Sequence, residues 1–222
     1  ADGVPPGAIC VGGLSEAACG IRRVAIPLAA AGPARKVLPS LLDVQLPFSL
    51  ESCVWDCAAL EREADGAGWI ATVAVARLEA AQARLAQGAA AGREPHLLDQ
   101  EGLALWTQAA QECPPRSPQE PRAVVYLGVD RAVLAMGRGR ALAVTQGFRQ
   151  VDAESACRLA RLAFGGSEEG VHWIWSGPQA ARADALAALR AGLSGTAALT
   201  ETVAPDPRAI LARAYAARAL TP

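Results

Sequence analysis

Lysine, histidine and aromatic residues are scarce in this chain of 222 residues. Lys36 is the only lysine, there are two histidines, and aromatic residues make up 5% of the chain. The 21 basic and 22 acidic residues give a net charge of −1. Binding to nucleic acid or to an anionic membrane surface depends on clustered positive charge, so we expect no nucleic-acid partner. With 52% hydrophobic residues, the chain is expected to fold as one sizeable core or two small lobes.

No uninterrupted apolar run approaches the roughly 18 residues that a transmembrane helix needs. Residues 1–13 also lack a basic leader followed by an apolar stretch. We therefore expect no direct membrane insertion by the visible chain. Because the sequence starts at Ala1 rather than at methionine, we expect a portion of a longer protein, whose flanking segments could still include membrane spans.

The six cysteines are scattered, and no CxxC motif occurs. On a strand, Cys53 and Cys57 would lie about 13 Å apart at about 3.3 Å per residue, which is beyond disulfide reach. Zinc needs four converging ligands, whereas His96 and His172 are far apart in the sequence. These features predict reduced cysteines, no metal site and a reducing cytoplasm.

Hydrophobic periodicity and turn residues predict a mixed α/β chain. In the first half they predict neighbouring strands at 8–11 and 23–28, a helix that begins at Pro33 and ends at Pro47, strands at 52–58 and 69–76, and helices at 77–91 and 99–112, the last with Asp99 as N-cap. In the second half they predict an antiparallel meander of strands at 123–127, 132–136 and 141–145 with a turn at 137–139, a helix at 151–164 capped by Asp152, a strand at 171–175, and helices at 178–192 and 207–220.

Four prolines fall within residues 113–121, where they can neither continue a helix nor donate to a sheet. We therefore place a domain boundary there. The predicted organisation is a first lobe at 1–113, which includes a strand-helix-strand-strand subdomain at about 21–91, a proline-rich linker at 114–121, and a second lobe at 122–222.

Glycine-containing turns are the first candidates for a ligand site, because exposed backbone N–H groups can hold phosphate. No GxxxxGK[ST] or GxGxxG motif occurs. Ser176-Gly177-Pro178, between a buried strand and a helix, is the best candidate, with nucleotide contact and a plain turn as the two interpretations. His172 is expected to be a core residue, and we find no paired acid and base. Phe48 either packs inward or lines an apolar groove for a partner.

Three phrases resemble the PilM, FtsA and GspL group of actin-like proteins. LPFSLE at 46–51 resembles the "iPfplee" phrase of the inserted subdomain in that group, and residues 89–105 resemble its return segment. Residues 123–147 resemble its second phosphate hairpin. The resemblance implies an actin-like, ribonuclease H-like fold with two lobes and an inserted strand-helix-strand-strand subdomain.

The sequence departs from the nucleotide-binding members at the phosphate sites. Their hairpin begins with Asp-Ile-Gly, and the matching phrase here is Tyr126-Leu127-Gly128; their adenosine-side Gly-Gly is matched by Ser176-Gly177-Pro178. The first phosphate hairpin is missing before Ala8, so it is either lost or outside this chain. Mg²⁺ needs hard anionic oxygens, which a neutral phenol does not supply. We therefore expect no hydrolysis, no catalytic or metal-binding residue and no cofactor, with Gly128, Ser176 and Gly177 as weak nucleotide-contact candidates.

The resemblance implies a non-catalytic cytoplasmic scaffold, peripheral at the inner membrane, of a type II secretion or type IV pilus machine. Its expected partners are an inner-membrane assembly protein and a secretion or pilus ATPase, and a homodimer is left open. Pro47, Phe48 and Trp55 are the candidate partner-binding residues. Two alternatives remain: an ATP-binding actin-like ATPase or small-molecule kinase whose first phosphate loop lies outside this chain, and an unrelated α/β binding domain in which the phrases are coincidental.

Overall fold

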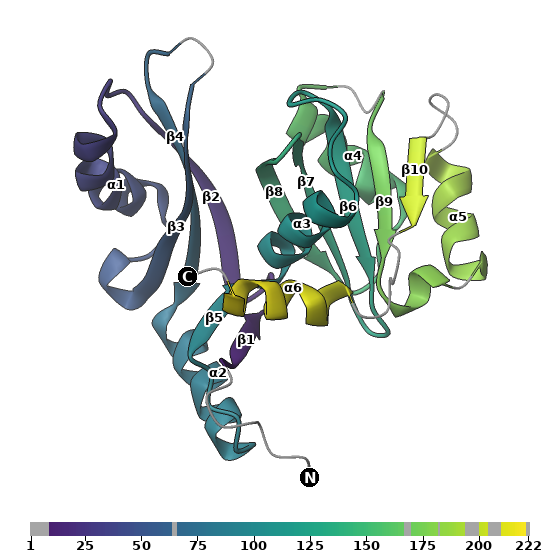
Figure 1. The fold of residues 1–222 in the computed structure, drawn as a ribbon, viewed down its shortest axis with the longest axis horizontal. Helices are drawn as coiled ribbons and strands as arrows, with labels where there is room; N and C mark the ends of the chain where they lie inside the picture. The colour runs from purple at the N-terminus through teal and green to yellow at the C-terminus, as the bar shows by residue number, and fades with distance from the viewer. Residues whose placement is uncertain are drawn as a thin grey trace. The chain divides into compact units, whose positions relative to one another are not determined.

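A computed structural model describes residues 9–63, 66–166, 170–181, 183–193, 200–203 and 210–220. The fold is mixed α/β and divides into two compact units (Figure 1). Unit 1 contains residues 1–16 and 96–222, and unit 2 contains residues 17–95. Unit 2 is therefore an insertion in the chain of unit 1. The predicted lobe boundary at 114–121 stays a prediction.

Unit 2 is a three-stranded antiparallel sheet in the order β2-β4-β3, with helix α1 packed on one face. Its elements are β2 (Cys19–Ile26), α1 (Ala31–Gln45), the 3₁₀ helix η1 (Leu50–Ser52), β3 (Cys53–Arg62), β4 (Trp69–Arg77) and α2 (Leu78–Ala90). A β-bulge interrupts β3 between Cys57 and Ala59. The edge strand β3 alternates over most of its length between half-buried and exposed residues, as expected for a sheet covered on one face, whereas the central strand β4 is buried at most of its positions.

The core of unit 2 forms where α1 covers the sheet. Ala34, Leu38 and Leu42 recur at a spacing of four on α1 and are buried, which places them on one helical face. They pack against apolar residues of the two adjacent strands: Val24, Ile26, Ala71, Val73 and Val75. Pro39 lies in the middle of α1. A proline there removes one intrahelical hydrogen bond, so packing of the apolar face must stabilise the helix.

Unit 1 holds a five-stranded mixed sheet in the order β10-β9-β6-β7-β8 and a two-stranded parallel sheet of β1 and β5. Its elements are β1 (Val11–Leu14), β5 (Leu97–Gln100), α3 (Glu101–Glu112), β6 (Pro121–Leu127), β7 (Ala132–Arg138), β8 (Ala141–Phe148), α4 (Ala153–Phe164), β9 (His172–Ser176), the 3₁₀ helix η2 (Pro178–Ala181), α5 (Ala183–Leu193), β10 (Thr200–Val203) and α6 (Ile210–Leu220). Among the described residues, we find no helix of the length and apolar character needed to cross a bilayer.

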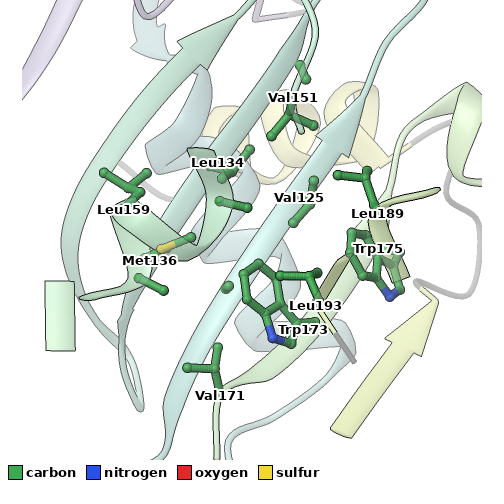
Figure 2. Close-up of a cluster of buried hydrophobic side chains, with 14 of the residues drawn as sticks. Val125, Leu134, Met136, Val151, Leu159, Val171, Trp173, Trp175, Leu189 and Leu193 are labelled. Atoms are coloured by element: carbon green, nitrogen blue, oxygen red, sulfur yellow. The ribbon is translucent and has the colours of Figure 1, made fainter. Parts of the chain in front are cut away.

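The largest core lies between the five-stranded sheet and helices α4 and α5 (Figure 2). It contains the buried residues Val125, Leu134, Met136, Val151, Leu159, Val171, Trp173, Trp175, Leu189 and Leu193. The rings of Trp173 and Trp175 are stacked, with centroids 6.0 Å apart. Because Trp173 and Trp175 alternate along one strand, both indoles reach the same face of the sheet.

The opposite face of this sheet packs against α3 and α6 (Figure 1). A smaller cluster forms there from Leu105 of α3, Val133 of β7 and Ile210 of α6, with Tyr126 partly buried against it. The five-stranded sheet of unit 1 is thus the middle layer of an α/β/α sandwich. In this arrangement, the N-terminus of α3 and the side chain of Tyr126 lie on the same side of the five-stranded sheet.

Most elements of the structure match those predicted, but several predictions are wrong. The two predicted N-terminal strands are not neighbours, because β1 pairs with β5 and β2 pairs with β4. The predicted turn at 137–139 lies later, since β7 continues through Arg138 and Gly139 adopts the left-handed conformation. Strands β5 and β10 were not predicted. Residues 8, 182 and 207–209 of predicted elements lie outside the described residues.

Candidate functional site

The carboxyl ends of β6 and β9 lie side by side in the five-stranded sheet. The two strands are parallel, and Tyr126 is the pairing partner of Ser176. Gly128 follows β6 directly and Gly177 follows β9 directly. The structure therefore brings the three candidates Gly128, Ser176 and Gly177 to one edge of the sheet, the edge at which ligands bind in open α/β sheets.

Both turns at this edge use their polar groups within the fold. The hydroxyl of buried Ser176 donates to the carbonyl oxygen of Val125 at 3.0 Å. The N–H of Gly128 donates to the carbonyl oxygen of Arg131 at 2.8 Å and closes the β6–β7 hairpin. Gly177 has φ +90°, and a Cβ built there would lie 2.5 Å from the carbonyl oxygen of Leu127. A glycine is thus required at position 177 by the close approach of two backbones and by its conformation.

The side chain of Tyr126 lies near an ion pair on the α3 side of the sheet. Arg131 of the hairpin and Glu101, the first residue of α3, meet at 2.6 Å between Nη2 and Oε1. Glu101 is buried, whereas the side chain of Arg131 is 49% exposed. Burial raises the pKa of Tyr126, the negative charge of Glu101 raises it further, and Arg131 opposes that effect. The phenol of Tyr126 is therefore neutral at neutral pH.

Tyr126 does not supply the ligand that a magnesium–nucleotide site would need at this position. Mg²⁺ is held by anionic oxygens together with water, and neutral Tyr126 supplies no such oxygen. The nearby carboxylate of Glu101 already has one oxygen paired with Arg131. Its other oxygen, Oε2, is buried and has no hydrogen-bond partner among the described residues. No step of phosphoryl transfer can be derived from this arrangement.

Sequence reasoning missed Glu101 and Arg131. A glutamate in the first turn of a helix is usually exposed to solvent and interacts favourably with the helix dipole. An arginine in a hairpin loop is usually solvated. The burial of Glu101 depends on the packing of α3 against β6, β7 and β8. The one signal in the sequence is the apolar stretch that follows Glu101, because it places α3 against a core.

The predicted partner-binding residues lie in unit 2. Phe48, between α1 and η1, and Trp55 of β3 are half-buried and pack against the same core cluster. The guanidinium of Arg77 lies over the ring of Phe48, 5.1 Å from its centroid. Pro47 is exposed. Phe48 therefore contacts the core with part of its ring while Arg77 covers another part.

Three other polar residues were singled out in the sequence: His172, Asp99 and Asp152. His172 is buried in β9 with its Nδ1 3.4 Å from Oε1 of Glu120, and burial lowers the pKa of His172. Asp99 is not the N-cap of α3, because it belongs to β5; the side chain of Gln100 accepts from the N–H of Leu103 instead. Asp152 caps α4 as predicted. Within the described part of the chain, no three His, Cys, Asp or Glu residues gather into a potential metal site.

No protein-family model matches this chain, and no curated protein matches it. Solved structures do match. A structure described as the PilM–PilN type IV pilus biogenesis complex is 18% identical with a TM-score of 0.69, covering 97% of this chain and 80% of the other. The cytoplasmic domain of EpsL, an inner-membrane component of the type II secretion system of Vibrio cholerae, is 18% identical with a TM-score of 0.55, covering 96% and 74%.

A third matching structure is a Bacteroides thetaiotaomicron protein with an actin-like ATPase fold and unknown function. It is 8% identical with a TM-score of 0.51, and the match covers 93% of this chain and 72% of that one. The fold of this chain is therefore actin-like, and it is similar to the folds of PilM and EpsL. This finding rules out a fold other than the actin-like one.

Proposed function

We propose that this chain is a non-catalytic, cytoplasmic actin-like scaffold of a type IV pilus or type II secretion machine, peripheral at the inner membrane. It binds an inner-membrane assembly protein and a secretion or pilus ATPase. The actin-like fold and its similarity to PilM and EpsL support the kind of machine. The observation that carries the absence of catalysis is the neutral phenol of Tyr126 at the end of β6, beside the Arg131–Glu101 pair.

The absence of catalysis is tested by titrating ATP with Mg²⁺ into the purified chain by calorimetry and by measuring phosphate release. We expect neither binding in the micromolar range nor turnover. Tyr126→Phe is the matched variant, since it removes only the hydroxyl, and it should behave as the parent chain does. Micromolar affinity with turnover in the parent chain would establish the ATPase or kinase alternative and overturn the scaffold proposal.

The partner role is tested with the cytoplasmic segments of inner-membrane pilus or secretion proteins encoded beside this gene. We expect one of them to bind in the micromolar range or tighter, and Pro47→Ser and Phe48→Leu to weaken binding. Pro47 is exposed and the change at Phe48 is conservative, so both variants should fold. Val129→Ser is the control, because Val129 is 82% exposed in unit 1. Equal affinity in all variants would remove this surface from the proposal, and no binding by any segment would contradict the partner role.

A further inference from the structure

The chain passes between the two units twice, from Glu16 to Ala17 and from Pro95 to His96. At each crossing, the residue on the unit 1 side forms hydrogen bonds with residues that are distant in the sequence. All of the contacts used below lie within a single unit. They show where the backbone is held at each crossing and where it is not.

The carboxylate of Glu16 is held in a polar socket at the N-terminus of α3. Its Oε1 accepts from the N–H of Gly102 at 2.8 Å, and its Oε2 accepts from the hydroxyl of Thr145 at 2.6 Å. The amide of Gln100 donates to the same hydroxyl at 3.2 Å. The socket thus uses groups of both α3 and β8, which fixes Glu16 to two elements of unit 1.

Two glycines make room for the side chain of Glu16. A Cβ at Gly102 would lie 2.5 Å from Oε1 of Glu16, and a Cβ at Gly147 would lie 2.8 Å from its Cβ. Real Cβ atoms do not approach other atoms so closely, so a larger residue at either position would displace Glu16. The socket therefore fits this one side chain closely.

The second crossing is held on both sides. In unit 1, the N–H of His96 donates to the carbonyl oxygen of Cys10 at 2.8 Å, and the N–H of Cys10 donates to Nδ1 of His96 at 3.1 Å. In unit 2, buried Pro95 packs on α2, where a Cβ at Gly88 would lie 2.5 Å from the proline Cδ. Only the backbone between Pro95 and His96 separates these contacts. The φ of Pro95 is fixed by its ring, so the remaining freedom lies in ψ of Pro95 and φ of His96.

The first crossing has a similarly short connecting segment. Glu16 is fixed in unit 1, and β2 of unit 2 begins at Cys19. Ala17 and Ala18 lie between them in a turn. Hinges in proteins are a few loop or terminal residues that absorb large φ and ψ changes between rigid parts.

We propose that Glu16 and His96 are the fixed pivots of a two-point hinge, and that unit 2 turns as a body about Ala17–Ala18 and Pro95–His96. The two anchors limit the motion to these four residues. Loss of either anchor lengthens the free segment and enlarges the range of orientations of unit 2. The hinge does not depend on which partner the protein binds.

The hinge is tested by distance distributions between spin labels carried by noncanonical amino acids at Val44 of unit 2 and Leu162 of unit 1. These side chains are 86% and 77% exposed, so labels there leave the cores intact. We expect Glu16→Ala and His96→Ala to broaden the distribution. Glu79→Ala is the matched control, because Glu79 is 78% exposed and pairs with exposed Arg77; it should leave the distribution unchanged. His96→Asn keeps a side-chain acceptor and should broaden it less than His96→Ala.

Amide exchange gives a second, local measurement in the full chain. In Glu16→Ala, the amide of Gly102 should exchange about tenfold faster, the factor expected when a hydrogen bond of ordinary net strength is lost. In His96→Ala, the amide of Cys10 should respond in the same way, while amides of β6 and β4 keep their protection. An unchanged distance distribution in both variants with these local amides released would overturn the hinge. Loss of protection throughout would show that the contacts support the fold of unit 1 instead, which would also overturn it.

Discussion

The guanidinium of Arg122 lies over the indole of Trp106 in unit 1, with its Cζ 5.8 Å from the ring centroid. Arg122 is fully buried at the start of β6. It donates from Nη2 to the carbonyl oxygen of Cys113 and from Nη1 to that of Gly139 at 3.3 Å. Glu120 lies 4.0 Å from its Nε. Arg122 thus connects the end of α3 with the start of β6, across the segment that contains four prolines.

Replacing Arg122 should destabilise unit 1 strongly. Arg122→Met leaves two carbonyl groups without their donor and removes one of the cations beside Glu120, and the loss of a buried charged partner costs about 3–5 kcal/mol. Arg122→Lys should lower the free energy of unfolding by nearly as much, because an ammonium group cannot reproduce the planar fork of donors. The measurement is the free energy of unfolding from urea denaturation. Arg116→Met is the control: its side chain is 69% exposed beside the same Glu120, so a loss of about 1 kcal/mol or less is expected. Equal losses for the two arginines would contradict this account.

The Arg131–Glu101 pair should show a measurable coupling free energy. One partner is buried and the contact is short, and hydrogen bonds to charged groups contribute about 1.5–3 kcal/mol. We expect a double-mutant cycle with Arg131→Ala and Glu101→Gln to give a coupling of about 1–2 kcal/mol, reduced by the exposure of Arg131. The same cycle on the exposed pair of Arg77 and Glu79 should give about 0.5 kcal/mol or less. A coupling no larger than that of the exposed pair would show that solvent screens the Arg131–Glu101 pair as well.

Continuous apolar runs predict strands well where both faces of a segment are buried. Strands β6, β7 and β9 are examples, because each is a short apolar run bounded by turn residues. Strand β5 was missed because it is only four residues long and runs directly into α3. That short strand is also what makes Asp99 a strand residue and not a helix cap. The partner of β1 could not be predicted, because β1 pairs with β5 across the whole of unit 2, residues 17–95, and such a distant pairing leaves no local signal.

The candidate site was predictable only in part. The glycine and serine turns after β6 and β9 follow from their positions after buried strands, and the sheet brings them together. The Arg131–Glu101 pair and the socket of Glu16 join residues 30 and 129 positions apart. Such contacts depend on how α3 packs on the sheet, so no spacing in the sequence indicates them. The predicted roles of Pro47, Phe48 and Trp55 stay predictions.

Gly177→Ala should destabilise unit 1 more than Gly170→Ala does. Both glycines have positive φ values, +90° and +70°, so an alanine at either position is strained by about 1 kcal/mol. At Gly177 the new methyl would also lie 2.5 Å from the carbonyl oxygen of Leu127, whereas nothing lies within 4 Å at Gly170. We expect losses of about 1 kcal/mol at Gly170 and about 2–3 kcal/mol at Gly177 in urea unfolding. Equal losses would mean that β6 and β9 move apart without cost.

The buried carboxyl of Glu16 should make stability depend on pH in the direction opposite to that of a salt-bridged acid. Burial raises the pKa of Glu16 above its ordinary value of 4.5, and the hydrogen bonds from Thr145 and Gly102 oppose that effect only in part. Between the ordinary and the raised value, the folded state binds more protons than the unfolded state. The free energy of unfolding contributed by this group therefore falls as pH rises through that window.

Glu16→Gln has no titrating carboxyl, so the comparison with the parent chain isolates this effect. The free energy of unfolding of the parent chain, minus that of Glu16→Gln, should increase as the pH is lowered from 7 toward 4.5. The measurement is urea denaturation at several pH values, with Glu79→Gln as the control for an exposed carboxyl. A difference that stays constant, or that decreases toward acid, would show that the hydrogen bonds in the socket outweigh the cost of burying the charge.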